Sequence, residues 1–370
     1  MKIFFIGQKG VPALRGGGVE KHVESLALSL VKLGHDVFAY TRPNYIDRKI
    51  KSYKGVNLIS LPSIGGKNLD AISHTLFACL NLIFRKTDII HFHSIGPSSL
   101  IWLVRLFKPN TPIISTFHSQ CYHNDKWGSF ARRYLRFGEK MACKKADKVI
   151  VVSKPLGDYV KKNYPGADYV YLPNGVNRAE ILEAKAIKEK WGLEKGSYLI
   201  SVSRLVKNKG LELLVSSFRE LNIDKKLVIV GGGDLEPELK RLAGNDKRII
   251  FTGVQAGEAL AELFSNAYLF VQSSESEGLS ISLLEAMSYG LPCIVSDIEA
   301  NLEAVDSKAN TFKNANKDSL KRSILAILNK SDEVLVEEGK ELSKIVYAKY
   351  YWPKITEKIE ALYKESLGRA

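Results

Sequence analysis

Short apolar runs alternate with helical patterns along almost the whole chain, and this alternation restricts the possible folds more than any other feature. In the first half the runs lie at residues 2–6, 36–40, 56–61, 88–93, 112–117, 148–152 and 169–172. In the second half they lie at 198–202, 227–230, 249–252, 268–272 and 292–295. Short apolar runs separated by helical segments are typical of βαβ units with a parallel sheet. We therefore predict an α/β protein with two doubly wound, Rossmann-like domains.

The domain boundary is predicted near residue 177, because Pro173-Asn174-Gly175 is followed by a polar, charged stretch. A length of 370 residues suits two domains, which we assign to 1–177 and 178–352. A last helix over 353–370 has an apolar face made of Ile355, Ile359, Leu362 and Tyr363. Ligands of open α/β sheets bind at the carboxyl ends of the strands, so two such domains facing each other would enclose one cleft.

Charge is distributed unequally along the chain. Residues 1–178 contain 27 basic and 11 acidic residues, a balance of +16, whereas residues 179–370 contain 27 and 29, a balance of −2. All seven histidines also lie in the first part. This half is therefore expected to meet an anionic partner: nucleic acid, a membrane surface or an acidic small molecule.

Cysteine usage and hydropathy indicate a cytoplasmic protein without a membrane span. Cys79, Cys121, Cys143 and Cys293 are far apart and form no CxxC pair, so neither a zinc site nor a disulfide framework is expected. The apolar stretches 75–84 and 98–107 are shorter than the roughly 20 residues that a membrane-spanning helix needs. The N-terminus is interpreted as a first buried strand and not as a signal peptide.

The first strand is followed by a long glycine-rich loop, from Gly7 to Gly16-Gly17-Gly18, which leads into a helix. Exposed glycine backbone and a helix N-terminus together favour an anion. A dinucleotide site would require a tighter GxGxxG turn and an acid after the second strand, where this chain has Thr41-Arg42. The alternative is that the glycines only permit a surface turn.

A second motif extends from Glu277 through Ser280 to Glu285 and ends at Gly290-Leu291-Pro292. Its apolar spacing predicts a helix that begins near Ser280, with Glu277 on the preceding loop and Glu285 on the second turn. The helix start offers backbone donors to phosphate oxygens, and the two carboxylates can accept hydrogen bonds from sugar hydroxyls. Alternatively, Glu277 only complements the helix dipole and Glu285 is solvated.

A cationic loop follows the strand at 198–202 and contains Arg204 and Lys209. Two fixed positive charges at a strand end could hold a diphosphate and stabilise it as a leaving group. The alternative is that both side chains are simply solvated. The Gly231-Gly232-Gly233 turn at a neighbouring strand end has the same ambiguity.

Taken together, these motifs resemble the retaining, nucleotide-sugar-dependent glycosyltransferases of family 4, which have the GT-B fold. The resemblance rests first on the spacing of Glu277 and Glu285, which is followed by Ala286-Met287 and Gly290-Leu291-Pro292. It rests also on motifs earlier in the chain: the glycine-rich first loop, Thr116-Phe117-His118, Pro173-Asn174-Gly175-Val176 at the boundary, Ser203-Arg204-Leu205-Val206 and Lys209-Gly210. These motifs occur in the expected order over nearly the whole chain, and the terminal aromatic-rich helix resembles the one that crosses back to the N-terminal domain in that family.

The resemblance implies a role for each matching residue. Glu277 would contact hydroxyls of the donor sugar and Glu285 the ribose, while His118 would approach the transferred sugar. Arg204 and Lys209 would hold the diphosphate, with backbone donors at Gly278, Leu279 and Ser280. Gly253 and Val254 would lie near the base, and the Gly16-Gly17 loop would lie over the phosphate or the acceptor. Ser280 and Ser282 stand where the family often has Gly and Pro, so the sugar-binding rim departs from the family pattern.

No histidine or carboxylate cluster has the sequence spacing of a metal site, so we expect no metal and no cofactor beyond the nucleotide sugar. His118 can equally be a polar residue hydrogen-bonded at a strand end. An alternating strand pattern is sufficient to explain His91 and His93.

Residues 126–145 combine aromatic and basic side chains at helical spacing. Lys126 and Trp127 precede Phe130, Tyr134, Phe137 and Met141, and Arg132, Arg133 and Arg136 lie between them. Such a helix can rest on anionic lipid, each basic residue contributing about 1 kcal/mol. A helix packed on its own sheet with a solvated basic face would have the same sequence, and the charge balance favours the membrane.

The function expected from these features is transfer of a hexose-type sugar, with retention, to a hydroxyl of a glycolipid or lipid-linked saccharide in polysaccharide synthesis. The donor is expected to be a UDP-sugar rather than GDP-mannose, and the enzyme a peripheral protein on the cytoplasmic face of the membrane. A GT-B nucleotide-sugar epimerase, which needs no acceptor, remains an alternative. A nucleic-acid-binding protein is the other, but it would leave Glu277 and Glu285 without a role, and we expect no nucleic-acid partner.

Overall fold

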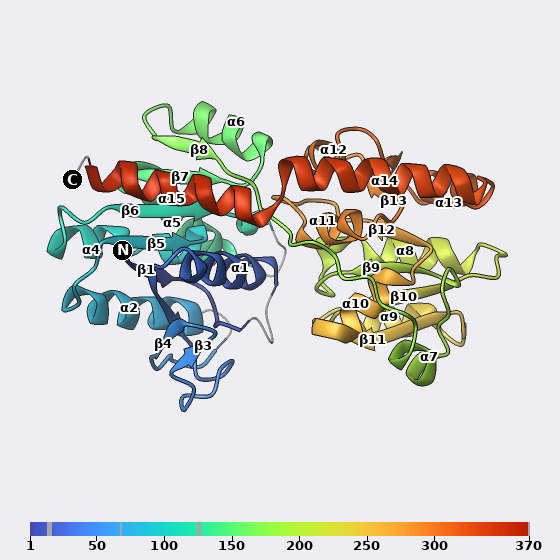
Figure 1. Ribbon diagram of the computed structural model, residues 1–370, viewed down its shortest axis with the longest axis horizontal. Helices are drawn as coiled ribbons and strands as arrows, with labels where there is room; N and C mark the ends of the chain where they lie inside the picture. The colour runs from blue at the N-terminus through green and yellow to red at the C-terminus, as the bar shows by residue number, and fades with distance from the viewer. Residues whose placement is uncertain (13–16, 67–68, 124–126, 369–370) are drawn as a thin grey trace. The chain divides into compact units, whose positions relative to one another are not determined.

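The computed structural model describes residues 1–12, 17–66, 69–123 and 127–368. The chain divides into two compact units: an N-terminal unit of Met1–Asn174 together with Trp352–Ala370, and a C-terminal unit of Gly175–Tyr351. Each unit has a mainly parallel sheet flanked by helices, which confirms the predicted α/β class with two Rossmann-like domains (Figure 1).

The N-terminal unit contains an eight-stranded sheet of order β3-β4-β2-β1-β5-β6-β7-β8, parallel except for the β3–β4 pair. Its strands are β1 Lys2–Ile6, β2 Asp36–Thr41, β3 Ser52–Tyr53, β4 Val56–Ser60, β5 Ile89–His93, β6 Ile113–Phe117, β7 Lys148–Val151 and β8 Tyr169–Tyr171. Its helices are α1 Gly18–Lys32, α2 Leu69–Ile83, α3 Ile95–Ser98, α4 Ile101–Phe107, α5 Ser129–Lys145, α6 Lys154–Asn163 and α15 Trp352–Gly368, with a short 3-10 turn at Cys121–His123.

Helices cover both faces of this sheet, because its strands are apolar on both sides. On one face α1 and α15 lie side by side, and Leu26, Ile355 and Tyr363 pack on Ile3 and Phe5 (Figure 1). On the other face α2 and α4 cover a second apolar core built around Phe4 and Phe92. The terminal helix therefore completes the core of the N-terminal unit.

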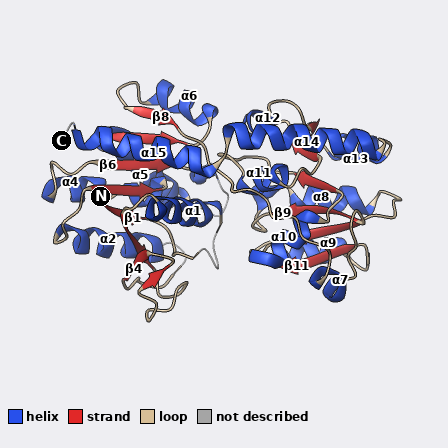
Figure 2. Ribbon diagram, in the orientation of Figure 1, coloured by secondary structure: helices blue, strands red, loops and turns tan. Residues whose placement is uncertain are grey.

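The C-terminal unit contains a six-stranded parallel sheet of order β11-β10-β9-β12-β13-β14. Figure 2 shows its strands in red with helices around them. Its strands are β9 Tyr198–Val202, β10 Lys226–Val230, β11 Ile249–Gly253, β12 Leu269–Gln272, β13 Cys293–Ser296 and β14 Asn310–Phe312. Its helices are α7 Ala186–Trp191, α8 Leu211–Arg219, α9 Glu236–Ala243, α10 Gly257–Ser265, α11 Ile281–Ser288, α12 Glu299–Val305, α13 Lys317–Leu328 and α14 Asp332–Lys349, with a 3-10 turn at Lys207–Lys209.

Strand order reverses once in each sheet. In the C-terminal unit the reversal falls between β9 and β12, and in the N-terminal unit it falls between β1 and β5. At such a reversal the loops that follow the two neighbouring strands run in opposite directions. This opens a crevice at the carboxyl ends of the strands, where ligands of open α/β sheets bind.

The chain passes between the units twice, after Asn174 and after Tyr351. Within the C-terminal unit the two passages are paired: Val176 forms a β-bridge with Tyr351, and its N–H donates to the carbonyl of Tyr350 at 2.8 Å. The guanidinium of Arg178 lies over the rings of Tyr347 and Tyr351.

Candidate active site

The predicted donor-binding residues of the C-terminal unit come together at its strand-order reversal. Arg204 and Lys209 follow β9, and Glu277 follows β12, its neighbour in the sheet. Both loops leave the carboxyl ends of parallel strands, so their side chains meet at the same edge. The structure thus joins two motifs that are about 70 residues apart in the sequence.

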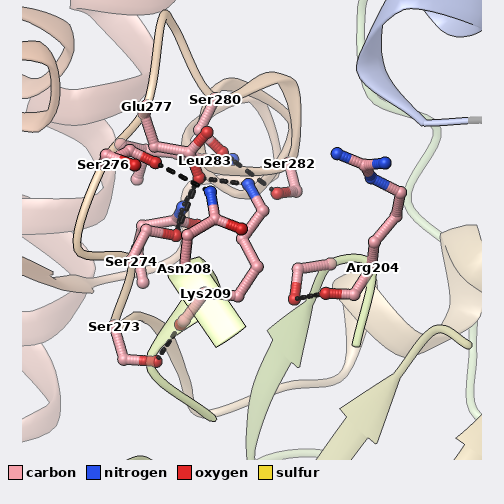
Figure 3. A network of polar contacts seen from close by, with 12 residues as sticks. Arg204, Asn208, Lys209, Ser273, Ser274, Ser276, Glu277, Ser280, Ser282 and Leu283 are labelled. Atoms are coloured by element: carbon pink, nitrogen blue, oxygen red, sulfur yellow. Dashed lines mark hydrogen bonds and ion pairs between the residues drawn. The ribbon is translucent and has the colours of Figure 1, made fainter. Parts of the chain in front are cut away.

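Glu277 is held by three donors on a single carboxylate oxygen. Its Oε1 forms an ion pair with Lys209 and accepts from Ser274 Oγ at 2.7 Å and from Gln272 Nε2 at 2.9 Å (Figure 3). The side chain is 11% exposed, and no hydrogen bond from a described residue reaches its Oε2. Because Oε1 fixes the orientation, Oε2 remains available to accept from a ligand hydroxyl.

Lys209 is positioned by a tight turn. Its carbonyl accepts from Ser273 Oγ at 2.9 Å, and the next residue, Gly210, has φ +61. A Cβ on Gly210 would lie 2.1 Å from the carbonyl oxygen of Ser273, so only glycine allows the two loops to approach this closely. The Lys209 side chain is 14% exposed, and its ammonium forms an ion pair with Glu277.

Arg204 lies beside this network without joining it. Its backbone is fixed by Ser203 N–H donating to Val230 and by Leu205 N–H donating to Gly232, each at 3.0 Å. The side chain is exposed, and Figure 3 shows its guanidinium directed away from the strand end. Among the described residues no carboxylate pairs with it, so its charge is available to an anionic ligand.

The glycine turn after β10 supports the backbone of this cationic loop. Gly231 has φ +142, and its Cβ would lie 1.8 Å from the carbonyl oxygen of Ser203. Replacing Gly231 by alanine is therefore expected to lower the free energy of unfolding by about 2 kcal/mol or more. Gly232→Ala is the matched control, since its φ is not positive and its nearest neighbour is the exposed side chain of Val254 at 3.1 Å. Equal urea midpoints for the two variants would contradict this prediction.

Helix α11 begins where the sequence predicted. Ser280 is its N-cap, and its Oγ accepts from Leu283 N–H at 3.3 Å and contacts Ser282 Oγ at 3.1 Å. Gly278 and Leu279 are buried on the loop that enters this helix. Glu285 is half-buried on the second turn. The N-terminus of α11 thus lies directly after Glu277.

The predicted base-binding residues lie on a neighbouring loop. Gly253 ends β11 with φ +70, and its carbonyl accepts from Gly231 N–H at 2.9 Å. Val254 is largely exposed. This loop therefore borders the glycine turn that supports Arg204.

His118 belongs to the N-terminal unit and lies in a cluster of buried imidazoles. It follows β6, His93 ends β5 and His22 lies on α1. The His118 ring stands edge-to-face on that of His22, with centroids 4.7 Å apart, and its Nε2 lies 3.5 Å from His93 Nδ1. The interpretation of His93 as a residue explained by its strand pattern alone is therefore incomplete, because its ring contacts His118.

These imidazoles are neutral at physiological pH. Burial lowers the pKa of His22 to about 4, although its hydrogen bond with Asn174 acts in the opposite direction. Burial, and then repulsion from neighbouring imidazoles, lowers the pKa of His93 and of His118 well below the ordinary value. The ring of His118 can therefore both donate and accept a hydrogen bond.

Nitrogen atoms of His22, His93 and His118 lie within 4.8 Å of one another, a grouping that the sequence spacing did not reveal. The three residues come from α1, β5 and the loop after β6, so they are brought together by the sheet. Three histidine nitrogens are a ligand set that can hold zinc, but here the three buried rings also pack on one another, with centroids 4.7–5.7 Å apart. We interpret it as packed neutral rings.

The glycine-rich loop is described from Gly17 onward, and Gly16 lies outside the described residues. Gly17 is the N-cap of α1, and its N–H donates to Glu20 Oε2 at 2.7 Å. The other oxygen of Glu20 accepts from Lys9 N–H at 3.4 Å. Glu20 thus fixes both ends of the loop and occupies the N–H that a phosphate would use.

Helix α5 buries one face and exposes the basic one. Its buried residues are Leu135, Gly138, Glu139, Ala142 and Cys143. Arg132, Arg133 and Arg136 are exposed, and Phe130, at 80%, and Phe137 are exposed beside them. Tyr134 and Trp127 are half-buried, because the Tyr134 hydroxyl bonds to Ser99 and the Trp127 Nε1 is covered by protein. Lys126 lies outside the described residues.

Two neighbouring helices add exposed apolar side chains. Helix α4 lies between α2 and α5. Exposed residues on α2 and α4 include Leu80, Trp102, Leu106 and Phe107, and Phe84, directly after α2, is exposed as well. Among the described helices, none combines the length and the apolar composition needed to cross a membrane.

Comparisons with known proteins agree with this architecture. Residues 183–348 match the family described as Glycosyl transferases group 1, and residues 16–180 match Glycosyltransferase Family 4. An uncharacterized glycosyltransferase of Methanocaldococcus jannaschii is 27% identical and covers 100% of both chains. A phosphatidyl-myo-inositol mannosyltransferase of Propionibacterium freudenreichii is 26% identical over 94% of this chain and 91% of its own. The alpha-monoglucosyldiacylglycerol synthase of Streptococcus pneumoniae is 27% identical over 75% of this chain and 67% of its own.

Solved structures with the same fold extend over the whole chain. Sucrose-phosphate synthase from Thermosynechococcus elongatus has a TM-score of 0.85 at 22% identity and covers 100% of both chains. HepE from Anabaena, in complex with UDP and glucose, has a TM-score of 0.80 at 15% identity and covers 99% of this chain and 100% of its own. Together with the two family matches, these likenesses show that the chain is a glycosyltransferase of group 1, a member of family 4 with the GT-B fold.

Proposed function

We propose that this enzyme transfers a hexose-type sugar from a nucleoside diphosphate sugar to a hydroxyl of a glycolipid or lipid-linked saccharide, with retention at the anomeric carbon. The observation that carries the donor half of this proposal is the arrangement of Arg204, Lys209 and Glu277 at the strand-order reversal of the C-terminal unit. These three side chains combine two cations with one oriented carboxylate, which matches a diphosphate attached to a polyhydroxylated sugar.

Diphosphate binding is assigned to the loop after β9 and to α11. Arg204 offers a planar set of donors, and Lys209 adds a second positive charge. Backbone N–H groups of Gly278, Leu279 and Ser280 at the start of α11 add donors where the helix dipole favours an anion. These groups neutralise the negative charge of the diphosphate in place of a divalent cation, so we propose that transfer requires no metal.

Sugar and nucleoside binding is assigned to the carboxylates. Glu277 presents Oε2 to the donor sugar while Oε1 stays bonded to Lys209, Gln272 and Ser274. Glu285 accepts from the ribose hydroxyls, and the base rests near Gly253 and Val254. In the N-terminal unit, Gly17 contacts the acceptor rather than the phosphate, since Glu20 occupies its N–H.

In the proposed reaction the bond between the anomeric carbon and the diphosphate oxygen breaks, and the acceptor oxygen bonds to the same face of that carbon. The proton of the acceptor hydroxyl passes to the departing diphosphate, so charge and atoms balance without a covalent enzyme intermediate. Arg204 and Lys209 stabilise the negative charge that develops on the diphosphate. The neutral ring of His118 orients the transferred sugar through a hydrogen bond.

The donor is proposed to be a UDP-sugar. HepE, which shares the fold, is recorded with UDP and glucose. Thermal-shift measurements with UDP, GDP and ADP test this proposal, because a nucleotide at about 100 times its dissociation constant stabilises the folded protein by about 2.7 kcal/mol. Stabilisation by GDP or ADP and not by UDP would overturn the choice of base, and NMR of the product's anomeric proton reports retention.

The acceptor is proposed to lie at an anionic membrane surface on the cytoplasmic side. Two relatives carry the name of a lipid, an alpha-monoglucosyldiacylglycerol synthase and a phosphatidyl-myo-inositol mannosyltransferase. In this chain α5 exposes Arg132, Arg133 and Arg136 beside Phe130. Basic and aromatic side chains on one helix face suit the interface of an anionic bilayer.

Reversing Arg132, Arg133 and Arg136 to glutamate is expected to weaken binding to phosphatidylglycerol vesicles by about 100-fold or more, since each basic residue contributes about 1 kcal/mol. Co-sedimentation measures this binding, and added salt should release the wild type. The matched control reverses the exposed Lys32, Lys354 and Lys358, which lie on α1 and α15 over the other face of the same sheet. An equal loss of vesicle binding in both triple variants would contradict the proposal. Binding of the wild type to vesicles of phosphatidylcholine alone would contradict it as well.

A further inference from the structure

His22 contacts both places where the chain passes between the two units. Its Nδ1 donates to Asn174 Oδ1 at 2.9 Å, and Asn174 is the last residue before the first passage. Its ring stands edge-to-face on Trp352, with centroids 5.1 Å apart, and Trp352 is the first residue after the second passage. One buried imidazole thus touches both ends of the connection.

The same imidazole contacts His118. The ring planes of His22 and His118 are inclined by 83° with centroids 4.7 Å apart, so an edge of one ring faces the plane of the other. Because Nδ1 of His22 donates to Asn174, its Nε2 carries the lone pair, and this atom is buried without a partner among the described residues. Asn174 therefore fixes both the tautomer and the orientation of the ring.

His118 is also held by the sheet, through His93, whose ring contacts that of His22 as well, with centroids 5.5 Å apart. His93 Nδ1 lies 3.5 Å from His118 Nε2, and the His93 ring stacks on that of His91 at 4.1 Å. His91 in turn bonds to Tyr363 at 2.6 Å and to Thr116 at 2.7 Å. His93 is therefore held by rigid strands, whereas His22 joins His118 to the connecting segments.

We propose that His22 is a positioning residue for glycosyl transfer, which holds the ring of His118 and links its orientation to both segments that connect the two units. This inference rests on the proposed role of His118 in orienting the transferred sugar. It assigns to His22 no contact with the substrate. A small displacement of a catalytic group can lower the rate by about 100-fold, so loss of this support should affect turnover.

Two substitutions separate the contacts of His22. In His22→Asn the side-chain amide can still donate to Asn174, but the ring that contacts His118 is lost. In His22→Phe the ring is retained, but the donor to Asn174 is lost. His74→Asn is the matched control, since His74 is also buried in the N-terminal unit and its Nε2 bonds to the carbonyl of Thr41 at 3.1 Å.

The expected result is that His22→Asn lowers kcat by about 10-fold to 100-fold, while the KM for the donor and the Kd for UDP remain unchanged. His74→Asn should leave kcat at the wild-type value. Asn174→Ala should also lower kcat. In the double variant its effect and that of His22→Phe should be less than additive, because the two changes remove the same hydrogen bond. Thermal unfolding of each variant shows whether it is folded at the assay temperature.

NMR of protein labelled with ¹⁵N-histidine provides a readout that does not depend on the substrate. Substitution of His22 should shift the ring signals of His118, and His74→Asn should leave them in place. Wild-type kcat in His22→Asn, or unchanged His118 signals in both His22 variants, would overturn the inference. Absence of transfer by the wild type would overturn the proposed function as well, so the two failures are distinguishable.

Discussion

Replacing Lys209 by alanine is expected to lower the rate of glycosyl transfer by about 100-fold to 1000-fold while the protein stays folded. The ammonium is proposed to stabilise the departing diphosphate, and it is also one of three donors that orient Glu277 through Oε1. Its removal should therefore weaken both charge stabilisation and sugar positioning. The measurement is kcat with a saturating nucleotide sugar, together with the thermal midpoint.

Lys207→Ala is the matched control for this experiment. Lys207 lies two residues away in the same 3-10 turn, but it is exposed and has no contact with Glu277 among the described residues. Arg204→Ala should lower the rate to a similar extent, because its guanidinium is the other cation assigned to the diphosphate. Wild-type turnover in both Lys209→Ala and Arg204→Ala would remove these residues from the mechanism.

Acid should destabilise the protein through the buried histidines of the N-terminal unit. Burial lowers the pKa of His22 from 6.5 to about 4, so between these values the unfolded chain binds a proton that the folded protein does not. The stability that the neutral ring provides is complete above pH 6.5 and is lost as the pH falls towards 4. For His22 this corresponds to about 3 kcal/mol, and His93 and His118 act in the same direction.

The variant His22→Phe isolates this contribution. It cannot bind a proton at position 22, so wild-type stability should fall relative to the variant by about 3 kcal/mol between pH 7 and pH 4. Urea unfolding at a series of pH values measures the difference. A difference that does not change with pH would show that His22 titrates alike in the folded and unfolded states.

Much of the fold could be predicted from the sequence, because parallel strands buried on both faces form uninterrupted apolar runs. The expected strands match β1, β2, β4 to β8 and β9 to β13 to within two residues at each end. Strands β3 and β14 were not predicted, since Ser52–Tyr53 and Asn310–Phe312 are too short and too polar to form an apolar run. Both lie at sheet edges, where pairing to a neighbour decides the structure.

The grouping of the proposed donor-binding residues was predictable for a different reason. These residues follow strands that the alternation of apolar runs and helical segments predicts. Arg204, Lys209 and Glu277 could therefore be placed at the carboxyl edge of the sheet before their contacts were known. The three donors on Oε1 of Glu277 were not predictable, because Gln272 and Ser274 belong to an ordinary strand end. The histidine cluster was missed because its members are far apart in the sequence and converge only when α1, β5 and β6 are packed together.

The placement of α15 has a consequence for the order in which the protein is made. The core of the N-terminal unit includes Ile355, Ile359 and Tyr363, which a ribosome adds only after the whole of the C-terminal unit. Residues 175–351 are contiguous, so the C-terminal unit can fold as soon as it has been synthesised. The N-terminal unit is therefore completed only after the C-terminal unit, and until then the surface that α15 covers is exposed to the solution or bound by a chaperone.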